Sequence, residues 1–168
     1  ERFMRISVEK QIMLEFMGIC DLKILTDLEM SIDRQSSILK KKDPRAFMAE
    51  DIYFHSIFYY AVKKGYCHQV LLANSGHYNR MRLLVMAEEG IEKRIIEQHK
   101  ELIDAVLAKD TDRLCNILNH HLNRIVSQER RIIQNYPDLF DEDRQEVHRE
   151  TDELGVDFLV ETKLKYHA

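Results

Sequence analysis

The sequence predicts an all-α protein, folded as an antiparallel bundle of six to seven helices. The chain of 168 residues contains only 5 glycines and 2 prolines, which leaves few of the turn residues that an all-β fold requires. Apolar residues recur three and four positions apart along most of the chain, as they do in helices that bury one face. The connections between these periodic segments are short, which is typical of antiparallel neighbours in a bundle.

The first four expected helices are separated by glycine, aspartate and proline. The first helix ends at Gly18 and the third ends at Gly65. Asp43-Pro44 marks the start of the third helix, because aspartate caps a helix and proline suits its first turn. The fourth helix contains Gly76 and ends before Gly90.

The last three expected helices follow Gly90. Asp110-Thr111 caps the sixth helix, and Tyr136-Pro137 ends it. A final amphipathic stretch has weaker periodicity, with Gly155 in its middle. The seven expected helices cover residues 2–17, 21–42, 44–64, 66–88, 91–109, 110–135 and 141–165.

Length and composition indicate one domain without affinity for nucleic acid or membranes. We expect a helical domain over residues 1–140, extended by residues 141–168. The net charge of −4 gives no general attraction to nucleic acid or to an anionic membrane. The 3 cysteines form no C-x-x-C pattern, and no apolar run reaches the ~20 residues of a membrane span. A cytoplasmic protein is therefore expected, and the start at Glu1 suggests one domain of a longer chain.

Four polar residues occupy positions where the helical pattern requires apolar ones. Asp51 and His55 lie four residues apart on the buried stripe of the third expected helix. His99 lies at the centre of the stripe of the fifth helix, and His121 lies on that of the sixth. An ionisable group on a buried stripe is costly unless it is paired or bound to a metal. One carboxylate and three imidazoles together form a typical set of metal ligands.

This ligand set suits several divalent metals. Imidazole nitrogen and carboxylate oxygen bind Zn²⁺, Ni²⁺, Mn²⁺ and Fe²⁺, with Zn²⁺ the favoured ion. A tetrahedral ion would be closed by four protein ligands, whereas an octahedral ion would keep two positions open. The alternative is that each histidine is a core residue that hydrogen bonds to a backbone carbonyl. Four such positions on three helices, including an i, i+4 pair, favour the metal site.

The fourth expected helix carries further candidates for ligand binding. Ser75 and Arg82 share one face, and an inward arginine would hold the carboxylate of a ligand through its planar guanidinium. The alternative is that Arg80 and Arg82 belong to a solvated face. Asn74 and His77 are additional candidates for the wall of the pocket.

Several short motifs together resemble a known family. They are Lys42-Asp43-Pro44-Arg45-Ala46-Phe47, the D-x-x-F-H element from Asp51 to His55, the segment from Glu97 to Val106 around His99, and His121-Leu122. In order and spacing, from residue 1 to 140, they resemble the FCD domain. This is the C-terminal, effector-binding domain of FadR-like transcription regulators in the GntR family.

The resemblance implies a divalent metal held by Asp51, His55, His99 and His121. It also implies a small organic acid that lies against the metal and an arginine of the fourth helix, with Arg82 preferred over Arg80. In the family, effector binding changes how an N-terminal winged helix-turn-helix domain binds its operator, usually as a homodimer. That DNA-binding domain is absent from this chain, so DNA is an expected partner only through a separate domain.

The expected function is therefore effector sensing in a bacterial transcription regulator, and not catalysis. Two alternatives compete with it: a metal-dependent enzyme on a helical bundle, and a purely structural dimerisation module. The enzyme has little support, because the chain lacks both the paired Glu-x-x-His motifs of di-iron bundles and an H-E-x-x-H motif.

Overall fold

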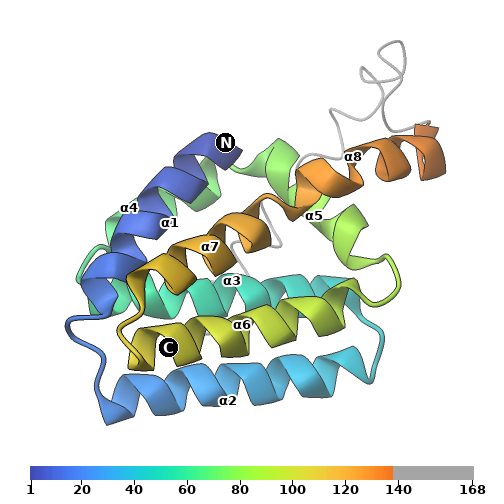
Figure 1. Cartoon of the computed structure of the whole chain (residues 1–168). Helices are drawn as coiled ribbons and strands as arrows, with labels where there is room; N and C mark the ends of the chain where they lie inside the picture. The colour runs from blue at the N-terminus through green and yellow to red at the C-terminus, as the bar shows by residue number, and fades with distance from the viewer. Residues whose placement is uncertain (138–168) are drawn as a thin grey trace.

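The computed structural model describes residues 1–137, and every regular element in that part of the chain is a helix (Figure 1). The predicted all-α class is thus confirmed. The helices are α1 (Arg2–Phe16), α2 (Leu22–Leu39), α3 (Pro44–Ala61), α4 (Gly65–Ala73), α5 (Gly76–Met86), α6 (Ile91–Leu107), α7 (Thr111–Leu122) and α8 (Arg124–Asn135).

Helix α3 lies at the centre of the bundle. It packs against α1, α2, α4 and α5, and α2 also packs against α6. Helix α7 lies between α6 and α1, while α8 extends beyond the end of α7 and contacts α5 (Figure 1). The inner faces of α1, α3, α6 and α7 therefore converge on the interior of the molecule.

Three aspartates cap the helices where the sequence indicates a start. Asp21 accepts a hydrogen bond from the backbone N–H of Ile24 at 2.8 Å, and Asp110 accepts one from Arg113 at 2.9 Å. Asp43 accepts from the N–H groups of the two residues that follow Pro44. Each cap satisfies N–H groups that have no partner within the helix, a contribution of about 1 kcal/mol.

Two of the expected helices are each divided in two. The segment 66–88 breaks at Asn74 and Ser75 into α4 and α5, and the segment 110–135 breaks at Asn123 into α7 and α8. At each break a side chain hydrogen bonds to the carbonyl four residues earlier: Asn74 to Val70 and Asn123 to Asn119. Such bonds compete with the continuing helix, which explains the two interruptions. The expected helix 141–165 lies outside the described residues.

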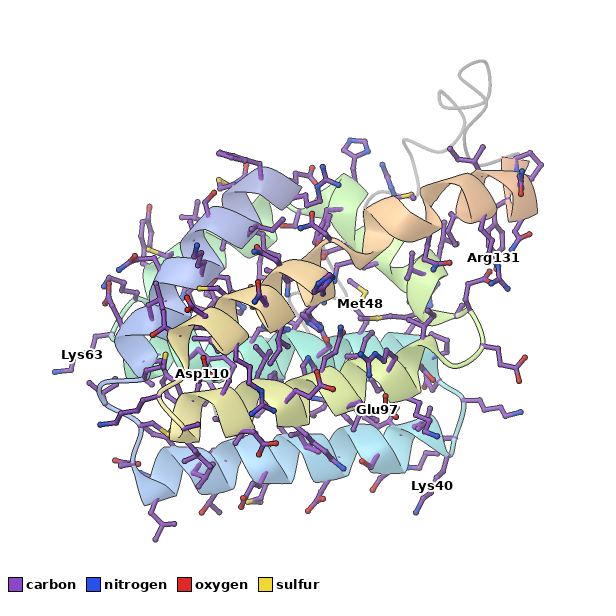
Figure 2. The ribbon with its side chains drawn as sticks, in the orientation of Figure 1. Lys40, Met48, Lys63, Glu97, Asp110 and Arg131 are labelled. Carbon is purple, nitrogen blue, oxygen red and sulfur yellow. The ribbon has the colours of Figure 1, made fainter. Side chains whose placement is uncertain are left out.

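An aromatic core lies beside the inward polar residues. Phe54 and Phe58 of α3 are fully buried and meet edge to face, with ring centroids 5.3 Å apart. The ring of Phe54 also stacks on His99 of α6 at 4.0 Å. Charged side chains such as Lys40 and Lys63 point away from the bundle (Figure 2). Among the helices of residues 1–137, none combines the length and the apolar character needed to cross a membrane.

Candidate metal centre

The structure brings together the four polar residues that the sequence singles out. Asp51 and His55 project from successive turns of α3, while α6 supplies His99 and α7 supplies His121. One potential ligand atom of each residue lies within 4.8 Å of all the others. The first three side chains are at most 1% exposed and His121 is 9% exposed, so the cluster is enclosed by protein.

The ligand atoms of the cluster are three imidazole nitrogens and one carboxylate oxygen. Nε2 of His55 lies 3.0 Å from Nε2 of His121. Oδ1 of Asp51 lies 3.4 Å from Nε2 of His99 and 4.0 Å from Nε2 of His55. The same nitrogen of each ring therefore faces the centre of the cluster.

The other nitrogen of each ring is held by an oxygen from a surrounding side chain. Nδ1 of His99 lies 2.8 Å from Oε1 of Gln35, and Nδ1 of His121 lies 3.2 Å from Oε1 of Gln98. Nδ1 of His55 faces the carboxylate of Glu9. Because these oxygens can only accept, the Nδ1 atoms carry the protons, and each Nε2 presents a lone pair to the centre. Ligating histidines are commonly oriented by such partners.

This arrangement of lone pairs fits a bound cation. With both protons on Nδ1, the two Nε2 atoms of His55 and His121 face each other at 3.0 Å with no proton between them. Within residues 1–137, Oδ1 of Asp51 and Nε2 of His99 are buried without a hydrogen-bond partner. Buried polar atoms are rarely left unsatisfied. A divalent metal at the centre would satisfy all four atoms.

Electrostatics keep the cluster in the protonation state that metal binding requires. Burial lowers the pKa of His99 to about 3, so its imidazole is neutral at pH 7. Burial would raise the pKa of Asp51, but the positive charge of Arg82 holds it below its usual value. Burial opposes ionisation of Glu9 as well, and His55 and Arg5 outweigh it, so the pKa of Glu9 is also lowered. Both carboxylates are therefore ionised.

A comparison with protein families supports this interpretation of the cluster. The model of the FCD domain matches residues 3–124, well over half of the chain, and that range contains all four cluster residues. The chain belongs to the FCD family. This domain binds effectors in FadR-like regulators of the GntR family and is regulatory, not catalytic. A comparison with curated proteins finds no match.

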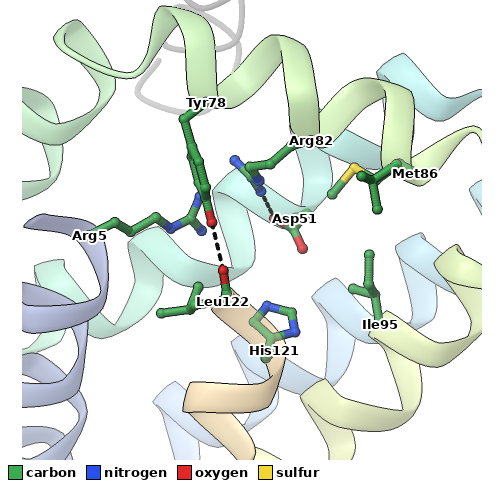
Figure 3. Close-up of a pocket in the computed structure, with 9 residues that line it drawn as sticks. Arg5, Asp51, Tyr78, Arg82, Met86, Ile95, His121 and Leu122 are labelled. Atoms are coloured by element: carbon green, nitrogen blue, oxygen red, sulfur yellow. Dashed lines mark hydrogen bonds and ion pairs between the residues drawn. The ribbon is translucent and has the colours of Figure 1, made fainter. Parts of the chain in front are cut away.

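A small cavity of the FCD domain adjoins the cluster and contains Arg82. The cavity has a volume of about 30 Å³, and Asp51 and His121 form part of its wall (Figure 3). Arg82 of α5 is 6% exposed and donates hydrogen bonds to Oδ2 of Asp51 and, at 3.0 Å, to Oδ1 of Asn79. Arg82 thus lies inward beside the cluster, with its guanidinium at the cavity.

The four remaining candidates of the FCD domain lie outside this cavity. Ser75 is buried, but its hydroxyl donates to the carbonyl of Leu71. Asn74, His77 and Arg80 are exposed, and Arg80 contacts the ring of His77. Asn74 and Ser75 lie at the junction of α4 and α5. His77 and Arg80 lie on the outer face of α5, whereas Arg82 lies on its inner face.

Four further inward residues surround the cluster and were not predicted from the sequence: Arg5, Glu9, Gln35 and Gln98. Arg5 and Glu9 lie four residues apart on the buried face of α1, in the same stripe as Ile12 and Phe16. They break an apolar pattern in the way that Asp51 and His55 do, so the signal was present. The two glutamines gave a weaker signal, since an uncharged polar residue on a helix is common at the edge of a buried face.

Proposed function

We propose that this FCD domain senses a short organic acid through a divalent metal. Asp51, His55, His99 and His121 would hold the metal. The observation that carries the proposal is the convergence of one potential ligand atom from each within 4.8 Å, with Oδ1 of Asp51 and Nε2 of His99 buried and without a hydrogen-bond partner in residues 1–137. Zinc is the favoured ion, because three imidazoles and one carboxylate match its usual ligands. Ni²⁺, Mn²⁺ and Fe²⁺ also bind imidazole nitrogen and carboxylate oxygen. When bound, the metal would supply a Lewis acid, and an ion with more than four coordination positions would attract a carboxylate to an open one.

Arg82 is the residue that would recognise the acid. Its guanidinium lies at the cavity beside Asp51, and a guanidinium forms strong charge-assisted hydrogen bonds with a carboxylate. The cavity of about 30 Å³ has room for about two water molecules. A bound acid must therefore be short, and it must displace part of the wall formed by α5, which carries Tyr78, Arg82 and Met86.

Displacement of the wall provides a route from the acid to the rest of the regulator. Helix α1 contacts the site directly, since Glu9 faces the ring of His55 and Arg5 lines the cavity. We infer that the acid biases the positions of α1 and α5, and thereby a winged helix-turn-helix domain outside this chain. The complete regulator would act in the cytoplasm as a homodimer.

The test is direct binding to the purified chain. Protein stripped with a chelator should take up one Zn²⁺ per chain, and at about 100 times the dissociation constant the ion should stabilise the fold by roughly 2.7 kcal/mol. Calorimetric titration with propionate should show binding to the zinc-loaded protein and none to the stripped protein. Equal thermal stability with and without zinc would contradict the proposal. So would propionate binding with the same affinity to the zinc-loaded and the stripped protein.

A further inference from the structure

A second guanidinium lies at the same cavity as Arg82. Arg5 of α1 is 9% exposed and lines the same cavity, which it enters from the left in Figure 3. The ring of Tyr78 separates the two arginines, with its centroid 5.7 Å from Cζ of Arg5 and 5.8 Å from Cζ of Arg82. The hydroxyl of Tyr78 donates to the carbonyl of Leu122 at 3.1 Å, which holds the ring in place. The two cations therefore have fixed positions on either side of one aromatic ring.

Arg5 keeps hydrogen-bond donors that the protein does not use. Its Nε donates to Oε2 of Glu9 at 3.2 Å, whereas its terminal nitrogens donate to none of the residues that the structure describes. Arg82 differs, because both of its terminal nitrogens are engaged, one with Asn79 and one with Asp51. A guanidinium has five N–H groups, so Arg5 can still bind a carboxylate bidentately.

The charges of the site leave an excess that one carboxylate cannot neutralise. The charges of Arg5 and Arg82 balance those of Glu9 and Asp51, with which they form ion pairs. A divalent metal then adds two positive charges to an enclosed site, where uncompensated charge is costly.

We propose that Arg5 makes this site selective for short dicarboxylates over monocarboxylates. This inference rests on the proposed function, because it needs the metal and Arg82 to hold the first carboxylate. Arg5 would bind the second carboxylate through its terminal nitrogens. The dianion would neutralise the two excess charges, whereas a monoanion leaves one positive charge and the donors of Arg5 unsatisfied. The small cavity limits the carbon chain between the two carboxylates.

Malonate and propionate test the proposal, because both have three carbons and differ in the second carboxylate. Calorimetric titration of zinc-loaded protein should show at least about tenfold tighter binding of malonate, the effect of one hydrogen-bonded ion pair. Arg5→Gln should abolish the preference, so that malonate and propionate bind the zinc-loaded variant with equal affinity. Arg2→Gln is the matched control, since Arg2 lies on the same helix and is exposed, and it should keep the full preference.

Several outcomes would overturn the proposal. Equal affinities of malonate and propionate in the wild type would refute the dicarboxylate preference. The proposed function would still stand in that case, because it depends on the metal-dependent binding of propionate. Sulfate that binds as tightly as malonate would show that charge alone is selected. If Arg5→Gln fails to fold, Arg5→Lys keeps the charge but lacks the guanidinium fork, so it should retain only part of the preference. Absence of both zinc and acid binding would refute the proposed function and this inference together.

Discussion

Nε2 of His55 and Nε2 of His121 lie 3.0 Å apart in the interior of the bundle, although the two residues are 66 positions apart in the sequence. Each ring turns Nδ1 to an oxygen, of Glu9 in one case and of Gln98 in the other. The helices thus hold two lone pairs face to face, an arrangement that a bound cation stabilises. The proposed metal centre of this FCD domain depends on that geometry.

Gln35 should tune the affinity for the metal. Its Oε1 lies 2.8 Å from Nδ1 of His99 and orients that ring. Gln35→Met removes the acceptor at similar volume, so zinc affinity should fall about 10-fold to 100-fold. A competition titration with a zinc indicator measures this. Gln11→Met is the control, since Gln11 is exposed on α1, and it should leave the zinc affinity unchanged. Equal zinc affinities of the two variants would show that Gln35 does not orient the ring of His99.

Arg82 should be required for acid binding, and Arg80 should not. Arg82 is buried beside Asp51, whereas Arg80 is exposed on the outer face of α5. Arg82→Gln should weaken propionate binding to zinc-loaded protein by tenfold or more, the effect of one charge-assisted hydrogen bond. Arg80→Gln should bind as the wild type does. The reverse ranking in a calorimetric titration would place the acid on the outer face of α5.

Tyr59 should make the fold sensitive to alkaline pH. Burial raises the pKa of its hydroxyl above the ordinary value of 10, and the charge of Glu9 raises it further. Above pH 10 the unfolded chain therefore releases this proton while the folded chain retains it, so stability falls as the pH rises. Urea unfolding between pH 8 and 11 should show a steeper decline for the wild type than for Tyr59→Phe.

The same variant should gain stability at neutral pH. The hydroxyl of Tyr59 is buried and has no hydrogen-bond partner in the described part of the chain. Its removal should therefore raise the free energy of unfolding by about 1 kcal/mol. A loss of stability in Tyr59→Phe at pH 7 would indicate that the hydroxyl is satisfied in solution.

Asp43 should contribute to stability through the start of α3. Its carboxylate accepts hydrogen bonds from the N–H groups of Arg45 and Ala46 at 3.1 and 3.0 Å. Asp43→Ala should lower the free energy of unfolding by about 1 kcal/mol, and Asp43→Asn should restore most of it, because asparagine also caps helices. Denaturant titration measures both variants. Equal losses in the two would mean that the charge of Asp43 matters and the cap does not.

The sequence predicted the helices and the cluster because both follow from local periodicity. Asp43-Pro44 and Asp110 begin helices in the structure as expected, since capping depends only on adjacent residues. The breaks at Ser75 and Asn123 were not predicted, because a side chain that bonds back to a carbonyl is equally compatible with a continuous helix. Residues 141–168 lie outside the described part of the chain, so their expected helical extension stays a prediction.

The surroundings of the cluster depend on packing between helices and were harder to predict. Arg82 could be placed inward from its own helix, but its partner Asp51 comes from another helix. Gln35 reaches His99 across 64 residues of sequence, and no local pattern specifies that contact. Arg5 and Glu9 were visible as polar residues on an apolar stripe, yet their role emerges only when α1 packs against α3.

The most direct test of the account is the metal content of the chain. Native mass spectrometry of protein exposed to Zn²⁺ and then dialysed should show one ion per chain for the wild type. Asp51→Ala with His99→Ala should show none, and circular dichroism should confirm that this variant is still helical. A wild type without the ion, or a variant that retains it, would contradict the central claim that these four residues form a metal centre.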